Sequence, residues 1–197
     1  MKSKALIDKT LAALEFSLHG RADFFLTTSF GFQSSLLFFL FSEIGVKPKC
    51  LFVKSQLATG GIDRQMDYLL DKYDIDLSIV DRTGWLDHEL HGNDFMDLGE
   101  LQRRSLCSDL KRQPLLDYIK SNNFKIWISG IRKDQSQARK SVEFMEVTDL
   151  NVIKISPLFA WSKIEVSDLI SANKLKINSE YVDLCKLNDS KECGLHY

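Results

Sequence analysis

Apolar residues recur along the chain with two different spacings, which predict alternating helices and strands. Between Ser3 and Leu18, leucine and isoleucine residues stand three or four positions apart, which is the spacing of one helix face. Short apolar runs, such as residues 24–28, instead predict buried strands. The predicted helices are residues 3–18, 36–44, 62–73, 110–121 and 162–171. The predicted strands are residues 24–28, 49–53, 77–80, 125–129 and 151–156.

Strands that alternate with helices favour a mostly parallel sheet covered by helices on both faces. We therefore expect a three-layer α/β domain over residues 1–177, with an irregular polar stretch at 81–104. The chain shows little apolar periodicity after Leu175, which predicts a flexible C-terminal tail over residues 178–197.

Ligands of such open sheets bind beyond the carboxyl ends of the strands. Three segments follow predicted strands and should therefore supply the site, namely residues 29–35, 54–61 and 130–139.

The charge and length of the chain exclude several classes of protein. The 197 residues suit one domain. Lys and Arg number 26 against 27 for Asp and Glu, a net charge of −1, so a strongly basic, nonspecific nucleic-acid binder is excluded. The most apolar run, residues 35–41, is far shorter than the roughly 20 residues of a membrane-spanning helix. The N-terminus carries no signal-peptide pattern, so we expect a cytoplasmic protein with neither membrane nor nucleic acid as partner.

The four cysteines, Cys50, Cys107, Cys185 and Cys193, form no Cys-x-x-Cys pair, and we expect most of them to be thiols in a reducing compartment. With no His-Glu-x-x-His motif either, a dedicated metal site is not expected. Cys50 lies in an apolar run, which is typical of a structural cysteine. Cys193 lies in a polar C-terminal segment, three residues before His196, which favours a redox nucleophile.

Two polar segments are candidates for anion binding. Residues 29–35 lie between a strand and a helix, where hydroxyl groups and backbone N–H groups can hold a phosphate. Gly31 there allows a positive φ and close approach of a ligand. The segment lacks the endings of the common phosphate-binding loops, so an ordinary turn is the alternative.

The second candidate is the most basic cluster of the chain, residues 130–140. Arg132 and Arg139 could each bind an anion in bidentate fashion. A solvated, charged loop is the alternative interpretation.

These segments, in this order, resemble the phosphoadenosine phosphosulfate (PAPS) reductase family, a branch of the PP-loop nucleotide-binding superfamily. The matching segments are residues 29–34, 111–115, 130–139, 155–158 and the Glu-Cys-Gly-Leu-His sequence at 192–196. The resemblance runs from about Ala22 to the C-terminus. It implies a PP-loop fold and the reduction of a sulfonucleotide to sulfite and an adenosine nucleotide.

The resemblance also implies roles for individual residues. Cys193 and His196 would be catalytic: Cys193 would attack the sulfur of the nucleotide and form an S-sulfocysteine, from which thioredoxin or glutaredoxin would release sulfite. The substrate-binding residues would be Ser29, Phe30, Gly31, Gln33, Ser34, Ser35, Lys111, Gly130, Arg132, Gln135 and Arg139.

The cysteines bear on cofactor and substrate. The iron–sulfur branch of this family, which reduces adenosine phosphosulfate (APS), carries a Cys-Cys pair and a later Cys-x-x-Cys. At the position of the Cys-Cys pair, this chain has Leu106-Cys107. Between that position and Cys193, the chain has a single cysteine, Cys185, in place of a Cys-x-x-Cys. We therefore expect no iron–sulfur cluster and no bound cofactor, with PAPS as the substrate. The sequence leaves open whether Cys107 or Cys185 forms a disulfide with Cys193, and a homodimer is compatible with it.

Two other functions stay open. The first is a PP-loop enzyme that uses ATP for adenylation or sulfur transfer, although Phe30 and Gln33 replace the Gly and Asp of its usual loop. The second is a noncatalytic nucleotide-binding module, against which the intact segment 192–196 argues.

The chain departs from the family pattern in two places, the segment 54–61 and the short stretch before Cys193. The first departure bears on recognition of the nucleoside, and the second on recognition of the sulfate.

Overall fold

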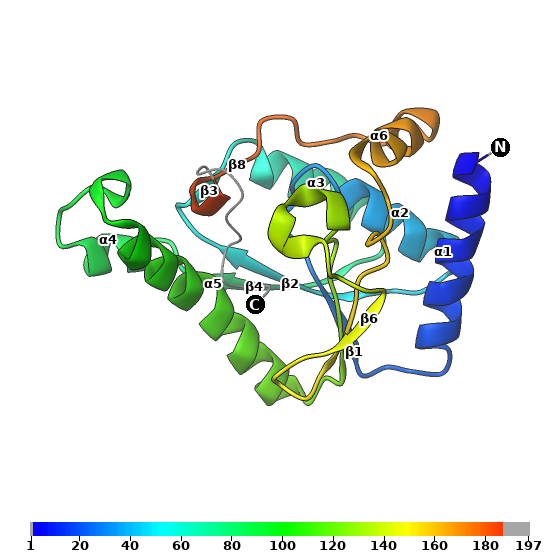
Figure 1. Cartoon of the computed structure of the whole chain (residues 1–197), viewed down its shortest axis with the longest axis horizontal. Coiled ribbons are helices and arrows are strands. Elements are labelled where there is room, and N and C mark those ends of the chain that lie inside the picture. Colours follow the sequence, from blue (N-terminus) through cyan, green and yellow to red (C-terminus); the bar gives the residue numbers. More distant parts are fainter. Residues whose placement is uncertain (1, 187–197) are drawn as a thin grey trace.

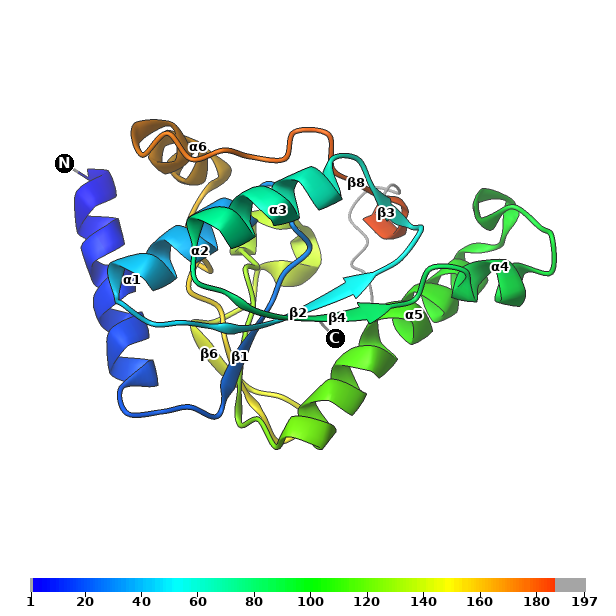
Figure 2. The same ribbon diagram turned by 180° about the vertical axis from the view of Figure 1, so that it is seen from behind.

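The computed structural model describes residues 2–186 and contains a central sheet between layers of helices (Figures 1 and 2). The helices are α1 (Lys2–Leu18), α2 (Ser34–Glu43), α3 (Ile62–Lys72), α4 (Trp85–Leu90), α5 (Glu100–Asn122) and α6 (Lys163–Ala172). The strands are β1 (Phe24–Thr27), β2 (Lys49–Lys54), β3 (Ala58–Thr59), β4 (Asp76–Asp81), β5 (Ile126–Ile128), β6 (Met145–Val147), β7 (Ile153–Ile155) and β8 (Val182–Asp183). Single 3-10 turns cover Phe95–Asp97, Lys133–Gln135, Gln137–Arg139 and Leu184–Lys186.

The main sheet of the described chain has six strands in the order β4-β2-β1-β5-β7-β6. All neighbours in it run parallel except β6, which pairs antiparallel with β7. The strand order reverses at β1, which pairs with β2 on one side and with β5 on the other. In such sheets the reversal opens a crevice at the carboxyl ends of the two strands, so the site is expected beyond β1 and β5.

Alternate side chains of the strands enter two different cores, because successive residues of a strand point to opposite faces. Phe24 and Leu26 belong to the core under α1, α2, α3 and α6, which lie on one face. Phe25 belongs to the core on the other face, where Leu115 and Ile119 of α5 pack (Figure 2). The prediction of a mostly parallel, three-layer α/β fold is therefore confirmed.

The apolar run at residues 35–41 forms most of α2, and it is apolar because seven of the ten positions of this helix are buried. Within residues 2–186, no helix combines the length and the apolar character that crossing a membrane requires.

Helix α5 begins at Glu100, ten residues before the predicted start, and α4 lies within the stretch that was expected to be irregular. The buried positions in the first half of α5 include Cys107 and Lys111, so an apolar period is hard to see in this part of the sequence. This half of α5 packs with α4 in a third apolar cluster that includes Leu57 and Leu86. Both helices extend to one side of the molecule (Figure 1).

The prediction of a tail from residue 178 onward is wrong for residues 178–186, which pack against the domain. The buried amide of Asn178 donates to the carbonyl oxygens of Phe30 and Gly60, at 3.2 and 2.8 Å. Strand β8 then pairs antiparallel with β3, and Asp183 is buried. Polar hydrogen bonds anchor this segment, so it carries no apolar period to reveal it. Cys193 and His196 lie outside the described residues.

Candidate functional site

A cavity of about 270 Å³ lies where β1, β2 and β5 end. This is the edge of the sheet at which the strand order predicts a ligand site. Its lining comes from β2, from the segments that follow β1 and β5, from α5, and from Tyr181 and Asp183. The predicted site residues that line it are Ser29, Gly31, Gln33, Ser34, Lys111, Gly130, Gln135 and Arg139. Phe30, Ser35 and Arg132 are not among its lining residues.

The loop after β1 is held in a tight turn by one hydroxyl group. Thr28 Oγ1 accepts a hydrogen bond from the backbone N–H of Phe30 at 3.2 Å and donates to Ser34 Oγ at 3.1 Å. The loop then enters α2, whose first residue, Ser34, lines the cavity, while its backbone N–H donates to the carbonyl oxygen of Gly31 at 3.2 Å. The positive end of the dipole of α2 therefore lies beside the cavity, which suits an anion.

The positive φ of this loop lies at Phe30 (φ 51°) and not at Gly31, which corrects the role expected for the glycine. Gly31 matters for another reason: a Cβ atom there would lie 3.2 Å from the ring of Tyr181. The side chain of Phe30 is fully buried and packs edge-on against Phe52, with ring centroids 5.1 Å apart. Phe30 is therefore a core residue and not a lining residue.

Ser35 also turns away from the cavity. Its hydroxyl accepts from the side-chain amide of Gln65 at 2.8 Å and donates to the carbonyl oxygen of Lys176. These bonds join α2 to α3 and to the segment before β8. The structure therefore places Ser35 outside the lining of the cavity, because its hydroxyl joins elements of the fold.

A chain of side-chain amides connects the two loops that flank the cavity. Gln33 donates to the carbonyl oxygen of Gly130 at 2.6 Å and accepts from Gln135 at 2.7 Å. Gln135 Oε1 in turn accepts from the guanidinium of Arg139. These bonds fix the side chains of both glutamines and place Arg139 at the cavity wall. Gly130 lets the side chain of Leu37 in α2 lie close to its backbone, because a Cβ atom at position 130 would lie 2.7 Å from Leu37.

Arg132 does not join Arg139 at the cavity, which corrects the expected pair. Its side chain is buried, and its Nε donates to Asp134 at 2.8 Å. The other carboxylate oxygen of Asp134 accepts from the backbone N–H of Lys163, at the start of α6, at 2.5 Å. Arg132 is therefore used to tie its loop to α6.

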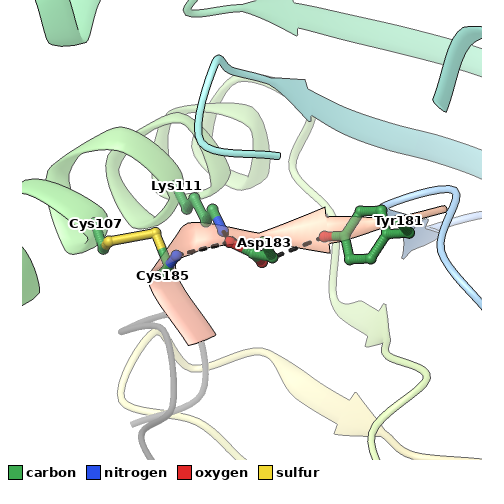
Figure 3. Close-up of a disulfide and its surroundings, with 5 residues drawn as sticks. All are labelled: Cys107, Lys111, Tyr181, Asp183 and Cys185. Carbon is green, nitrogen blue, oxygen red and sulfur yellow. Dashed lines mark hydrogen bonds and ion pairs between the residues drawn. A yellow bond between two sulfur atoms is a disulfide. The ribbon is translucent and has the colours of Figure 1, made fainter. Parts of the chain in front are cut away.

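Lys111 forms a buried ion pair with Asp183, and Figure 3 shows the two side chains meeting between α5 and β8. Lys111 Nζ lies 2.7 and 2.8 Å from the two carboxylate oxygens. Asp183 also accepts from the hydroxyl of Tyr181 at 3.2 Å and from the backbone N–H of Cys185 at 3.1 Å. The carboxylate thus balances the charge of Lys111 at the cavity.

Tyr181 and Asp183 line the cavity, and the sequence analysis missed both. They lie in a polar stretch that ends in a strand of two residues, which is too short for a recognisable pattern. The sequence contains one related signal, the departure from the family pattern in the stretch before Cys193.

A disulfide joins Cys107 of α5 to Cys185, with Cα atoms 6.1 Å apart (Figure 3). The expectation of thiols is therefore wrong for these two cysteines, which are 78 positions apart and are brought together only by the fold. Cys50 is a free, buried thiol, and its burial raises its pKa above the usual value. Within residues 2–186, no group of three or more His, Cys, Asp or Glu side chains is arranged to hold a metal ion.

Solved structures share this fold. The PAPS reductase of Candida auris is 18% identical, with a TM-score of 0.71 over 89% of this chain and 87% of that one. The FMN adenylyltransferase of Candida glabrata is 13% identical, with a TM-score of 0.68 over 90% of this chain and 58% of that one. At these identities, the likeness supports the PP-loop type of fold and nothing finer.

Sequence comparison narrows the relationship. The adenosine 5′-phosphosulfate reductase of Bacillus cereus is 26% identical over 197 residues, covering 86% of this chain and 82% of the relative. The family model of the phosphoadenosine phosphosulfate reductase domain matches residues 23–184, which include both loops at the cavity, Lys111 and Asp183. The resemblance noted in the sequence is confirmed, and the chain belongs to the phosphoadenosine phosphosulfate reductase domain family.

Proposed function

We propose that this protein reduces an adenine sulfonucleotide to sulfite and the corresponding adenine nucleotide. One observation carries the proposal: two of the segments that resemble the family, residues 29–34 and 130–139, meet at one cavity at the switch point of the sheet. The family to which the chain belongs acts on this class of substrate, which supports the same conclusion.

The cavity offers two kinds of surface that suit a nucleotide. Ser29, Ser34 and Arg139, together with the N-terminus of α2, would bind the phosphosulfate group. Apolar side chains, Phe52, Val53 and Leu115 among them, line the cavity as well and would contact the base. Because Asp183 already balances Lys111, Arg139 would be the main cationic contact of the anion.

The chemistry would begin at Cys193. Its thiolate attacks the sulfur of the sulfonucleotide, the sulfur–oxygen bond breaks, and the electron pair leaves with the nucleotide phosphate. Arg139 would stabilise the charge that develops on this leaving phosphate. His196 would favour the thiolate as an imidazolium three residues away. A dithiol protein of the thioredoxin or glutaredoxin kind supplies the two electrons that release the sulfonate from Cys193 as sulfite.

PAPS is the proposed substrate, because the chain lacks the second cysteine of the pair at Leu106-Cys107 and therefore the cysteine set of the cluster-containing branch. The disulfide between Cys107 and Cys185 agrees with this choice, since neither sulfur is then a thiolate that could bind iron. APS is the second candidate, because the Bacillus relatives carry that name.

The proposal predicts sulfite release that depends on Cys193. The purified protein is incubated with PAPS, APS or ATP together with thioredoxin and a reductant, and sulfite and pyrophosphate are measured. We expect sulfite from PAPS, and from Cys193→Ser we expect nucleotide binding without sulfite. Full turnover by Cys193→Ser would contradict the mechanism. Pyrophosphate released from ATP, without sulfite from either sulfonucleotide, would favour the adenylating class instead.

A further inference from the structure

The disulfide between Cys107 and Cys185 lies directly beside the candidate substrate cavity. Cys107 precedes Lys111 by one turn of α5, and Cys185 follows Asp183 by two residues (Figure 3). Lys111 and Asp183 both line the cavity. The backbone N–H of Cys185 is bonded to the carboxylate of Asp183, so the cysteine is held at a defined distance from the cavity wall.

The two sulfur atoms differ in their surroundings. Cys107 is buried in the apolar cluster with Leu57, Leu86 and Leu110. Cys185 is partly exposed and stands at the end of the described chain, next to the segment that leads to Cys193. An external thiolate therefore reaches this disulfide more easily at Cys185 than at Cys107. After reduction, the thiolate of Cys185 likewise has better access to another sulfur than the thiolate of Cys107.

We propose that Cys107 and Cys185 are an internal dithiol, with Cys185 as the residue that releases sulfite from Cys193. The inference rests on the proposed function and deepens its second half. Cys193 is the eighth residue after Cys185, and eight residues of extended chain span at most about 28 Å, so the connection is long enough for the two sulfurs to meet.

The exchange balances in three steps. First, the thiolate of Cys185 attacks the sulfur of S-sulfocysteine 193, the bond between that sulfur and the sulfonate breaks, and sulfite leaves with the electron pair. Second, the thiolate of Cys107 attacks Cys185 in the resulting Cys185–Cys193 disulfide and frees Cys193 as a thiolate. Third, an external dithiol reduces the Cys107–Cys185 disulfide and is itself oxidised. The disulfide in the structure is thus the oxidised product of one turnover.

This route explains why a reducible pair stands next to the cavity. An external dithiol protein would otherwise have to reach a sulfur at the substrate site itself. With the internal pair, the sulfite-releasing step takes place within one chain, where the reacting thiol is present at a high effective concentration. A disulfide that only staples α5 to the segment 181–186 is the competing interpretation, and it predicts no transfer of electrons to Cys193.

A single-turnover experiment separates the two interpretations. The protein is fully reduced, the small thiol is removed without oxygen, and the sulfonucleotide that the steady-state assay identifies is added with no other reductant. We expect wild type to release one equivalent each of nucleotide and sulfite and to end with the Cys107–Cys185 disulfide, which peptide mass mapping detects. We expect Cys185→Ser to release nucleotide and keep the sulfonate on Cys193. Cys107→Ser should release sulfite and accumulate the Cys185–Cys193 disulfide.

The controls separate an effect on the sulfite-releasing step from an effect on folding. All proteins are compared in the reduced state, where none has the disulfide, and nucleotide affinity is measured for each. Cys50→Ala removes a cysteine in the core and should behave like wild type. If wild type itself keeps the sulfonate on Cys193 until an external thiol is added, the inference is overturned while the proposed function stands. If no variant releases nucleotide, both fail.

Discussion

Arg132 and Arg139 show how seven positions of chain separate a structural residue from a candidate binding residue. Both arginines are buried, and both follow β5 in the same loop. Arg132 is ion-paired with Asp134, which in turn is bonded to the start of α6. Arg139 bonds to Gln135 and lines the cavity. Arg132 therefore ties its loop to Asp134, whereas Arg139 lies at the cavity wall, where a guanidinium can bind an anion in bidentate fashion.

Arg139→Ala should therefore weaken sulfonucleotide binding by about ten- to a hundredfold, since a charge-assisted hydrogen bond contributes roughly 1.5–3 kcal/mol. Arg132→Ala should leave the affinity of the folded protein near that of the parent and lower its stability instead. Calorimetric titration with PAPS, on the unreactive Cys193→Ser background, measures both affinities. Equal affinities of Arg139→Ala and its parent would place the anion elsewhere. A large affinity loss in Arg132→Ala alone would restore the role first expected for that residue.

At the scale of elements, α5 and β8 are joined by one buried ion pair. Lys111 is 7% exposed and Asp183 is 6% exposed. Strand β8 has two residues and pairs only with the equally short β3 in its sheet. Backbone pairing on this scale contributes little, so side-chain contacts must hold the segment that carries Tyr181 and Asp183 to the cavity.

Lys111→Met should lower the free energy of unfolding by about 3–5 kcal/mol, because it leaves the Asp183 carboxylate buried without its cation. The matched control is Lys54→Met, which removes an exposed ion pair with Asp63 and should cost no more than about 1 kcal/mol. Urea unfolding measures both values. Adding Asp183→Leu to Lys111→Met should recover part of the loss. Equal effects of the two lysine substitutions would show that burial does not set the strength of this pair.

At the scale of the whole molecule, the disulfide closes a loop between two cysteines 78 positions apart. The enclosed chain contains β5, β6 and β7, which are three of the six strands of the main sheet, together with α6 of the opposite layer. A crosslink over such a distance removes many conformations from the unfolded chain and so favours the folded state.

Reduction of this disulfide should lower the free energy of unfolding by about 2–4 kcal/mol. Urea unfolding of oxidised and fully reduced protein measures the difference, and mass spectrometry verifies the state of the cysteines. The double variant Cys107→Ser with Cys185→Ser should unfold at the same urea concentration with or without reductant, whereas Cys50→Ala should keep the difference. An oxidised sample that unfolds like the reduced one would mean that the crosslink does not stabilise the fold.

The order of the main elements, the parallel sheet and the loops that reach the cavity could all be predicted from the amino-acid sequence. Apolar periods report these features because each strand and helix must bury one face or both. Local polar signals were equally readable where they act within a few residues. The predicted helix 162–171, for example, starts at Ser162, and the side chains of Ser162 and Glu165 each accept a hydrogen bond from the backbone N–H of the other at the start of α6.

Which polar side chains line the cavity, and which join distant elements, depends on the three-dimensional fold and could not be predicted. Ser34 and Ser35 are adjacent, yet one lines the cavity and the other bonds to Lys176, 141 positions away. Asp183 and Cys185 gain their partners, Lys111 and Cys107, from a helix more than seventy positions earlier. An ion pair, a disulfide or an amide bond between distant elements leaves no periodic trace in the sequence, because each depends on where two backbones meet and not on the spacing of residues along either one.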